Sequence, residues 1–154
     1  MKHNPVIVIA LAMLLLLVLS IFLITMDRNN IDYYIKVNDC QIAKTSCKVV
    51  LDDENAIEIN ILPRGIPSTE KLTISVHAIG KNGQIQSANI AFEALEIDTT
   101  TPQYRLYKKT ASSFYGSGFL ALCSLSKQNW LAHLVVKKAG KVWAVELPFK
   151  KRLE

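Results

Sequence analysis

The sequence predicts a mainly β protein in which an N-terminal transmembrane helix precedes an immunoglobulin-like antiparallel β-sandwich of about seven to eight strands. Three observations lead to this prediction. A long apolar run lies near the N-terminus, apolar and polar residues alternate in short segments beyond it, and turn-forming residues separate those segments. The part of the 154-residue chain beyond the run is long enough for one domain and too short for two typical ones.

The N-terminal run has the length of a membrane-spanning helix. Val6 to Thr25 contains no charged residue and, at about 1.5 Å of rise per residue, spans roughly 30 Å. No small-residue cleavage site follows it, so we expect an uncleaved signal anchor. Lys2 lies in the short N-terminal tail, and positive charge stays on the cytoplasmic side. The prediction is a single-pass protein of the bacterial inner membrane with its C-terminal domain in the periplasm.

These boundaries divide the chain into five parts. We expect a cytoplasmic tail at 1–5, the transmembrane helix at 6–26, a linker at 27–32, the periplasmic domain at 33–150 and a basic tail at 151–154.

Charge is unevenly distributed along this chain of net charge +5, with acidic residues early and basic residues late. Lys150, Lys151 and Arg152 near the C-terminus predict a surface that lies against anionic lipid headgroups. A solvated face that aids solubility is the favoured alternative. The basic excess is too mild to predict a nucleic-acid partner. The expected partners are the lipid bilayer and other membrane or periplasmic proteins.

Alternation and turn signals predict the strands of the domain. The expected strands are 33–37, 48–51, 57–61, 72–78, 90–97, 104–107, 114–122, 131–136 and 142–147. Asn82-Gly83 predicts a tight hairpin after the fourth segment, and Ala139-Gly140 predicts the last hairpin.

Two tryptophans and two glycines have expected roles in packing. Trp130 and Trp143 are expected in the core between two sheets. Gly116 and Gly118 predict either a β-bulge or a bend that avoids a close neighbour.

Three cysteines in a periplasmic domain predict at least one disulfide. Cys40 and Cys47 flank a short loop between two expected strands, and we favour their pairing because of this proximity. A Cys47–Cys123 bridge is the alternative, since closing a longer loop is worth about 4.5 rather than about 2.5 kcal/mol in the chain-entropy model. The remaining thiol is expected to be buried and inert.

Metal binding and catalysis have little support in the sequence. Cys123, His77 and His133 are candidate ligands for copper, but neither histidine belongs to a ligand-spaced motif, and His77 fits a surface position on a strand. No nucleophile elbow, P-loop, zinc-binding helix or paired C-x-x-C occurs. We therefore expect no enzyme and no cofactor, and we keep the Cys-His metal site as an alternative.

Four features of the sequence occur together: the N-terminal helix, Cys40 with Cys47, the stretch Ile59 to Pro63 followed by Ile66-Pro67, and Gly118 leading to Cys123 and Trp130. On these residues the layout resembles the FixH/YtkA-like group of small, membrane-anchored periplasmic proteins, in particular a proteobacterial subgroup. The resemblance implies an immunoglobulin-like fold and links to cytochrome oxidase assembly and copper handling. Some relatives carry a methionine in an acidic segment where this chain has Glu96 to Thr101, without methionine.

The function that the sequence predicts best is a membrane-anchored, non-enzymatic accessory or interaction module. Such a module would assist the assembly of a respiratory or other envelope complex. A copper-handling domain with Cys and His ligands is the alternative.

Overall fold

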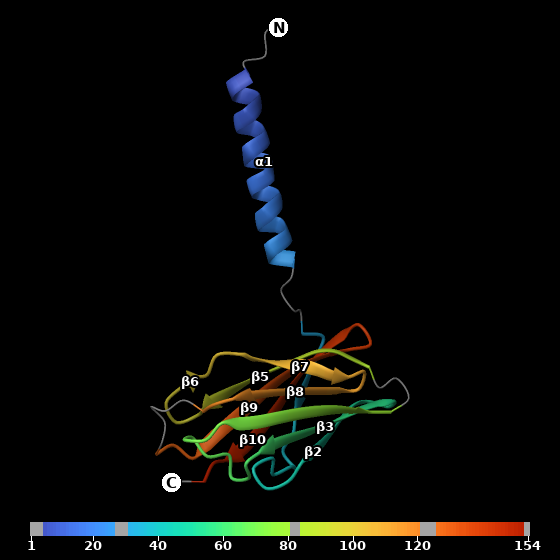
Figure 1. Cartoon of the computed structure of the whole chain (residues 1–154), viewed down its shortest axis with the longest axis vertical. Helices are drawn as coiled ribbons and strands as arrows, with labels where there is room; N and C mark the ends of the chain where they lie inside the picture. The colour runs from blue at the N-terminus through green and yellow to red at the C-terminus, as the bar shows by residue number, and fades with distance from the viewer. Residues whose placement is uncertain (1–4, 27–30, 81–83, 121–125, 153–154) are drawn as a thin grey trace. The chain divides into compact units, whose positions relative to one another are not determined.

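The computed structural model describes residues 5–26, 31–80, 84–120 and 126–152 (Figure 1). The chain divides into two compact units, Met1–Asn30 and Ile31–Glu154.

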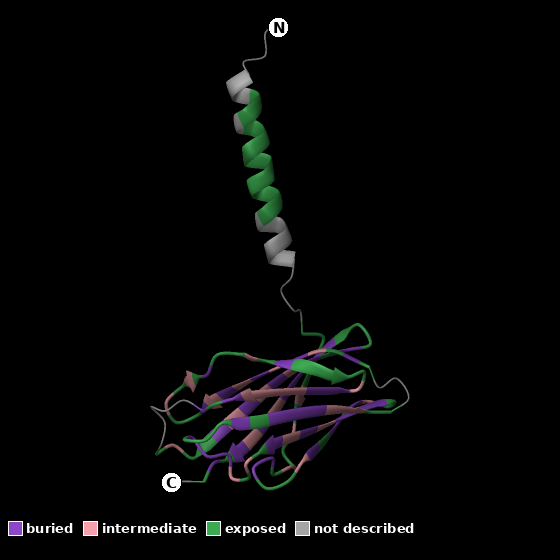
Figure 2. Ribbon diagram, in the orientation of Figure 1, coloured by how far each residue is buried: buried purple, intermediate pink, exposed green. Residues whose placement is uncertain are grey.

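The first unit contains one helix, α1 (Pro5–Met26), of 22 residues. Its described side chains are exposed (Figure 2). Because α1 covers the whole predicted range of 6–26, the prediction of a helix there is confirmed. Among the described residues, no helix satisfies the combined length and apolarity needed to cross a bilayer. Its transmembrane character stays a prediction.

The second unit is mainly β, as predicted. Its described strands are β1 (Tyr33–Lys36), β2 (Cys47–Asp52), β3 (Asn55–Leu62), β4 (Leu72–Ile79), β5 (Ile85–Ala94), β6 (Thr99–Thr100), β7 (Tyr104–Thr110), β8 (Ser113–Gly118), β9 (Asn129–Lys138) and β10 (Lys141–Lys150).

These ten strands form one nearly closed sheet in the order β1-β10-β9-β5-β7-β8-β4-β3-β2, with β6 paired to β5. All pairs are antiparallel except β1 with β10. The sheet is continuous because β7 pairs with a different neighbour along each half. Tyr104 to Leu106 pair with β5, whereas Tyr107 to Thr110 pair with β8. The structure differs here from the predicted sandwich, because one nearly closed sheet surrounds the core in place of two separate sheets.

One apolar core fills the space that the sheet encloses. Alternating residues of the strands point inward, which gives the burial patterns of β3, β5 and β9. Both tryptophans lie in this core as predicted, with Trp130 0% and Trp143 1% exposed. Buried and exposed positions alternate along the strands in Figure 2.

The Asn82-Gly83 prediction of a hairpin is wrong about the strands that it joins. β4 lies between β3 and β8, and β5 pairs with β6, β7 and β9. Both edges of β4 are therefore occupied by other strands. Residues 81–83 themselves lie outside the described residues. The Ala139-Gly140 hairpin between β9 and β10 is confirmed, and both residues adopt positive φ, at 51° and 77°.

The glycines of β8 avoid a close neighbour. A Cβ atom added at Gly118 would lie 2.6 Å from Cδ2 of Tyr104, and one at Gly116 would meet the side chain of Leu106. The register between β8 and β4 is regular through both glycines. Of the two roles predicted for these glycines, the avoidance of a close neighbour is therefore confirmed, and the β-bulge is not.

A lysine at the end of β9 is buried in the second unit. The Nζ atom of Lys138 donates a hydrogen bond to Oδ1 of Asn55, whose Nδ2 donates to the carboxylate of Asp52 at 2.7 Å. Lys138 is 0% exposed. Burial lowers the pKa of its ammonium group from the usual 10.5, and the Asp52 charge opposes this shift in part.

This burial makes stability depend on pH. Between the lowered folded-state pKa of Lys138 and 10.5, the unfolded chain binds more protons, so the free energy of unfolding should rise with pH in this window. Lys138→Met should remove that rise, as measured by urea denaturation at neutral and alkaline pH. Lys137→Met, at the exposed neighbouring position, is the control and should keep it. Identical pH profiles for Lys138→Met and the unchanged chain would contradict this account.

Candidate functional site

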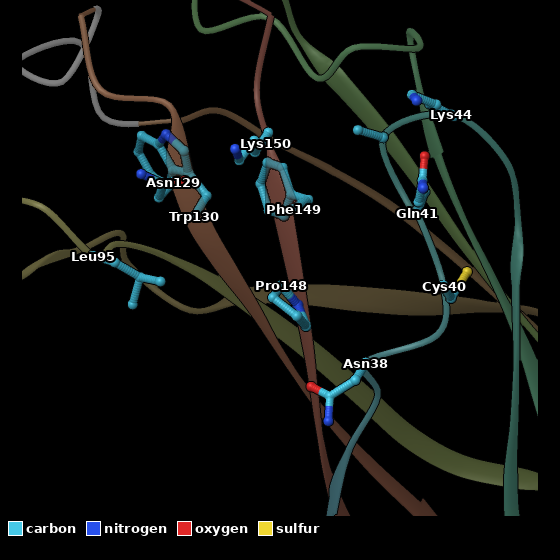
Figure 3. A pocket seen from close by; sticks show the side chains of 11 residues that line it. Asn38, Cys40, Gln41, Lys44, Leu95, Asn129, Trp130, Pro148, Phe149 and Lys150 are labelled. Carbon is cyan, nitrogen blue, oxygen red and sulfur yellow. The ribbon is translucent and has the colours of Figure 1, made fainter.

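A cavity of the second unit lies where the ends of β9 and β10 meet the segment after β1. Its volume is about 510 Å³. Side chains from four separate stretches of chain line it, as Figure 3 shows. The lining residues are Asn38, Cys40, Gln41, Ala43, Lys44, Leu95, Asn129, Trp130, Pro148, Phe149 and Lys150.

One wall of the cavity is a loop held by a disulfide. Cys40 is bonded to Cys47, with Cα atoms 5.8 Å apart, so the structure contains the short-range pair that the sequence favoured. Within the loop, the carbonyl of Gln41 accepts hydrogen bonds from the amides of Lys44 and Thr45 at 2.8 and 3.0 Å. Ile42 is fully buried and packs in the core, which attaches the loop to the rest of the unit. Gln41 and Lys44 remain exposed beside it.

The floor of the cavity is aromatic. The ring of Trp130 stacks on Phe149, with centroids 6.4 Å apart and planes at 20°. Its Nε1 donates to the carbonyl of Lys127 at 3.1 Å, which satisfies the indole donor. Phe149 in turn packs edge-on against Phe92 in the core. The two rings are buried and continuous with the core.

A second cavity of about 460 Å³ shares Ala43, Lys44 and Lys150 with the first. Its remaining lining residues are Arg64, Gly65, Lys151 and Arg152. We call the two together the basic groove. Among the described residues, the lining of both cavities includes four lysine or arginine side chains that are exposed and no carboxylate.

Backbone hydrogen bonds join the parts of the basic groove. The amide of Gly65 donates to the carbonyl of Ala43, and the amide of Arg152 donates to the carbonyl of Gly65, both at 2.8 Å. Gly65 has φ of 84°, a conformation that glycine adopts readily, and the Cβ of Arg152 lies close to it. The cystine loop, the turn after β3 and the C-terminal end of β10 therefore form one connected surface.

A carboxylate beside the groove orients one of its amides. Oε1 of Glu96 accepts hydrogen bonds from the backbone amide of Asn129 at 3.2 Å and from its Nδ2 at 2.6 Å. The backbone hydrogen bond from Asn129 is the main cause that lowers the pKa of Glu96 below its ordinary value. With its Nδ2 engaged, Asn129 retains its side-chain oxygen as an acceptor.

The three residues of the expected lipid-facing surface do not share one environment. Lys150 and Arg152 are exposed and line the basic groove. Lys151 is 3% exposed, and its Nζ donates to Oγ of the buried Ser68 at 2.7 Å. Because β10 continues its alternation into the tail, Lys151 points inward, so this charge cannot lie on the surface.

The two candidate metal-binding histidines lie on different strands with different partners. His133 Nε2 lies 2.6 Å from Oε2 of Glu93, and its Nδ1 lies 3.5 Å from Oε1 of Glu146. His77 Nε2 lies 3.0 Å from the hydroxyl of Tyr115.

The candidate metal site receives no support from this placement. Cys123 lies outside the described residues. In the part of the chain that the structure describes, no group of three or more His, Cys, Asp or Glu side chains could hold a metal ion.

The hydroxyl of Tyr34 on β1 extends the cluster around His133. It donates to Oε1 of Glu146 at 2.5 Å, and this hydrogen bond is the main cause that raises the pKa of Tyr34. Four neighbouring strands, β1, β10, β9 and β5, are thereby connected on their outer face.

The sequence matches no family model and no curated protein. Among solved structures, a DUF4785 family protein from Legionella pneumophila subsp. pneumophila str. Philadelphia 1 is similar at 11% identity with a TM-score of 0.49. The similarity covers 64% of this chain, which spans 28% of that protein's length.

The sequence did not reveal most of the groove. Asn38, Gln41 and Lys44 lie in the segment between β1 and β2, Arg64 follows β3 and Asn129 begins β9, and these residues share no motif. The cystine and the late cluster of basic residues were the two available signals, and each forms one side of the groove.

Proposed function

We propose that this protein is a membrane-anchored accessory module of the bacterial inner membrane, with its β unit in the periplasm, where it binds a partner protein through the basic groove. The observation that carries the proposal is the groove itself: an apolar cavity over the buried Trp130–Phe149 pair, with exposed amides and exposed cations on one connected surface. Surfaces of this kind are typical of binding sites. In this proposal the nearly closed sheet is a variant of the immunoglobulin-like sandwich.

The anchor and the compartment have separate support. Helix α1 covers the uncharged run of Val6 to Thr25, whose length suits a bilayer core. The Cys40–Cys47 disulfide suits an oxidising compartment such as the periplasm. The resemblance to FixH/YtkA-like proteins supports a role in the assembly of a respiratory or other envelope complex. The module acts without catalysis in this proposal, since the sequence has no catalytic motif.

Site-specific photocrosslinking in native membranes tests the proposal. p-Benzoylphenylalanine in place of Asn38, at the cavity, should yield one discrete adduct with a second protein. The same group in place of Tyr107, which is 69% exposed on β7 and does not line the groove, should not yield it. Equal adducts from both positions, or none from Asn38, would contradict the proposed interaction.

A fusion experiment tests the compartment. Alkaline phosphatase fused after Glu154 folds only outside the cytoplasm, because it needs disulfides. We expect an active fusion that sediments with membranes. An inactive phosphatase fusion together with an active cytoplasmic reporter at the same position would place the β unit in the cytoplasm.

A further inference from the structure

Three exposed carboxamides line different sides of the cavity. Asn38 and Gln41 come from the segment after β1, and Asn129 begins β9. Figure 3 shows them arranged around Pro148 and Phe149 of β10. A carboxamide can donate and accept hydrogen bonds, and it therefore matches the N–H and C=O groups of a peptide backbone. All three are exposed, so a ligand can reach them.

Cations lie on the side of the cavity that continues into the second one. Lys44 and Lys150 belong to both cavities, and Arg64 and Arg152 extend the positive surface. Nη1 of Arg64 donates to the carbonyl of Ile61 at 3.2 Å, which holds this guanidinium in place. Since no carboxylate lines the groove among the described residues, its charge favours an anionic ligand.

The apolar part of the cavity has room for a side chain. Leu95 is 49% exposed at its edge, although it is a large aliphatic residue. The Trp130–Phe149 stack forms the floor below it. A volume of about 510 Å³ lies within the roughly 300–1,000 Å³ of typical ligand cavities. An apolar anchor that covers Leu95 would remove this exposed surface from water.

We propose that the basic groove binds an acidic peptide segment that carries one apolar anchor residue. The anchor side chain covers Leu95 next to Phe149, which is 7% exposed, while Trp130 stays buried beneath them. The backbone of the peptide bonds to the carboxamides, and its carboxylates lie beside Lys44 and Lys150. The inference rests on the proposed function and names the chemistry of the partner segment.

An acidic peptide fits the groove better than an anionic lipid does. An acyl chain in the cavity would bring no hydrogen-bonding groups to Asn38 and Gln41, whereas Asn129 already bonds to Glu96. Each carboxamide left without a partner on burial carries a desolvation cost of about 1–3 kcal/mol. A peptide backbone satisfies the same groups, and its acidic side chains match the cations.

Fluorescence anisotropy with the full chain in phosphatidylcholine nanodiscs tests this inference. The probe is a fluorescein-labelled peptide in which two glutamates stand on each side of a central leucine. We expect saturable binding that weakens with added salt. Replacing the glutamates with glutamine, or the leucine with serine, should each weaken binding about tenfold or more.

Two charge-reversed variants locate the site. K44E/K150E should weaken binding of the acidic peptide about tenfold or more, because two attractions become repulsions. K137E changes an exposed lysine at the opposite end of β9 and should leave binding unchanged. K44Q/K150Q should give an intermediate loss. Thermal unfolding of each variant identifies any that is misfolded, and the glutamine pair then decides the result.

Four results would overturn the inference. Equal binding of the glutamine peptide would exclude recognition of charge, and an equal loss in K137E would exclude the groove as the site. Displacement of the peptide by phosphatidylglycerol, but not phosphatidylcholine, vesicles would assign the groove to anionic lipid. If the Asn38 crosslink to a partner persists while the acidic peptide fails to bind, the proposed interaction with a partner protein is retained. Only the acidic peptide is then rejected as the ligand of the groove.

Discussion

Trp130→Ala is expected to lower the free energy of unfolding by about 3–5 kcal/mol. The indole is 0% exposed, stacks on Phe149 and donates to the carbonyl of Lys127. Alanine would remove the stack and the hydrogen bond and would leave a void that the surrounding strands cannot fill. Urea denaturation of the full chain, followed by far-ultraviolet circular dichroism, measures the change.

Two matched variants separate the causes of this loss. Trp130→Phe keeps an aromatic ring on Phe149 and removes the indole N–H, so we expect about 1–2 kcal/mol. Leu95→Ala changes a residue of the same cavity that is 49% exposed, and its effect on stability should stay within about 0.5 kcal/mol. A Trp130→Ala loss no larger than that of Leu95→Ala would contradict the role of Trp130 in the core.

Replacing Cys40 and Cys47 with serine is expected to lower the free energy of unfolding by about 2.5 kcal/mol or more. The bridge joins residues with a sequence separation of 7, so its entropic contribution is that of a short closed loop. Cys47 is also 0% exposed, and a buried serine hydroxyl adds to the loss. Denaturation of the double variant measures the effect.

The same variant should weaken binding at the groove, because the loop forms one wall of it. Reduction of the unchanged chain with dithiothreitol should reproduce the loss of stability without any substitution. The acidic peptide should bind less tightly to both forms, since Gln41 and Lys44 are then no longer fixed. If both forms keep the stability of the oxidised chain, the bridge does not hold the loop.

Local patterns in the sequence predicted most strands but not their partners. Ile57, Ile59 and Ile61 alternate with polar residues, and this pattern alone indicates a half-buried strand. The Asn82-Gly83 pair signals a turn and says nothing of which strands pair. The long-range pairing of β5 with β9 depends on burial across the whole core, which no short segment encodes.

The candidate site was predictable only in parts. The Cys40–Cys47 pair was favoured because the two residues lie close together in the sequence, with Cys47–Cys123 as the alternative, and the late lysines are visible in composition. The inward position of Lys151 was missed because charge alone does not give the register of a strand end. The groove combines residues far apart in the chain, from Asn38 to Arg152, so only the fold brings them together.

The parallel pairing of β1 with β10 gives the second unit a mechanical property. Its ladder runs from Tyr33 beside Trp143 to Lys36 beside Glu146, with further hydrogen bonds from Asp32 and Val37. The chain enters β1 at its N-terminal end, whereas β10 ends at Lys150 in the groove. A pull between these two points loads the ladder in shear, and all its hydrogen bonds resist together instead of breaking one by one.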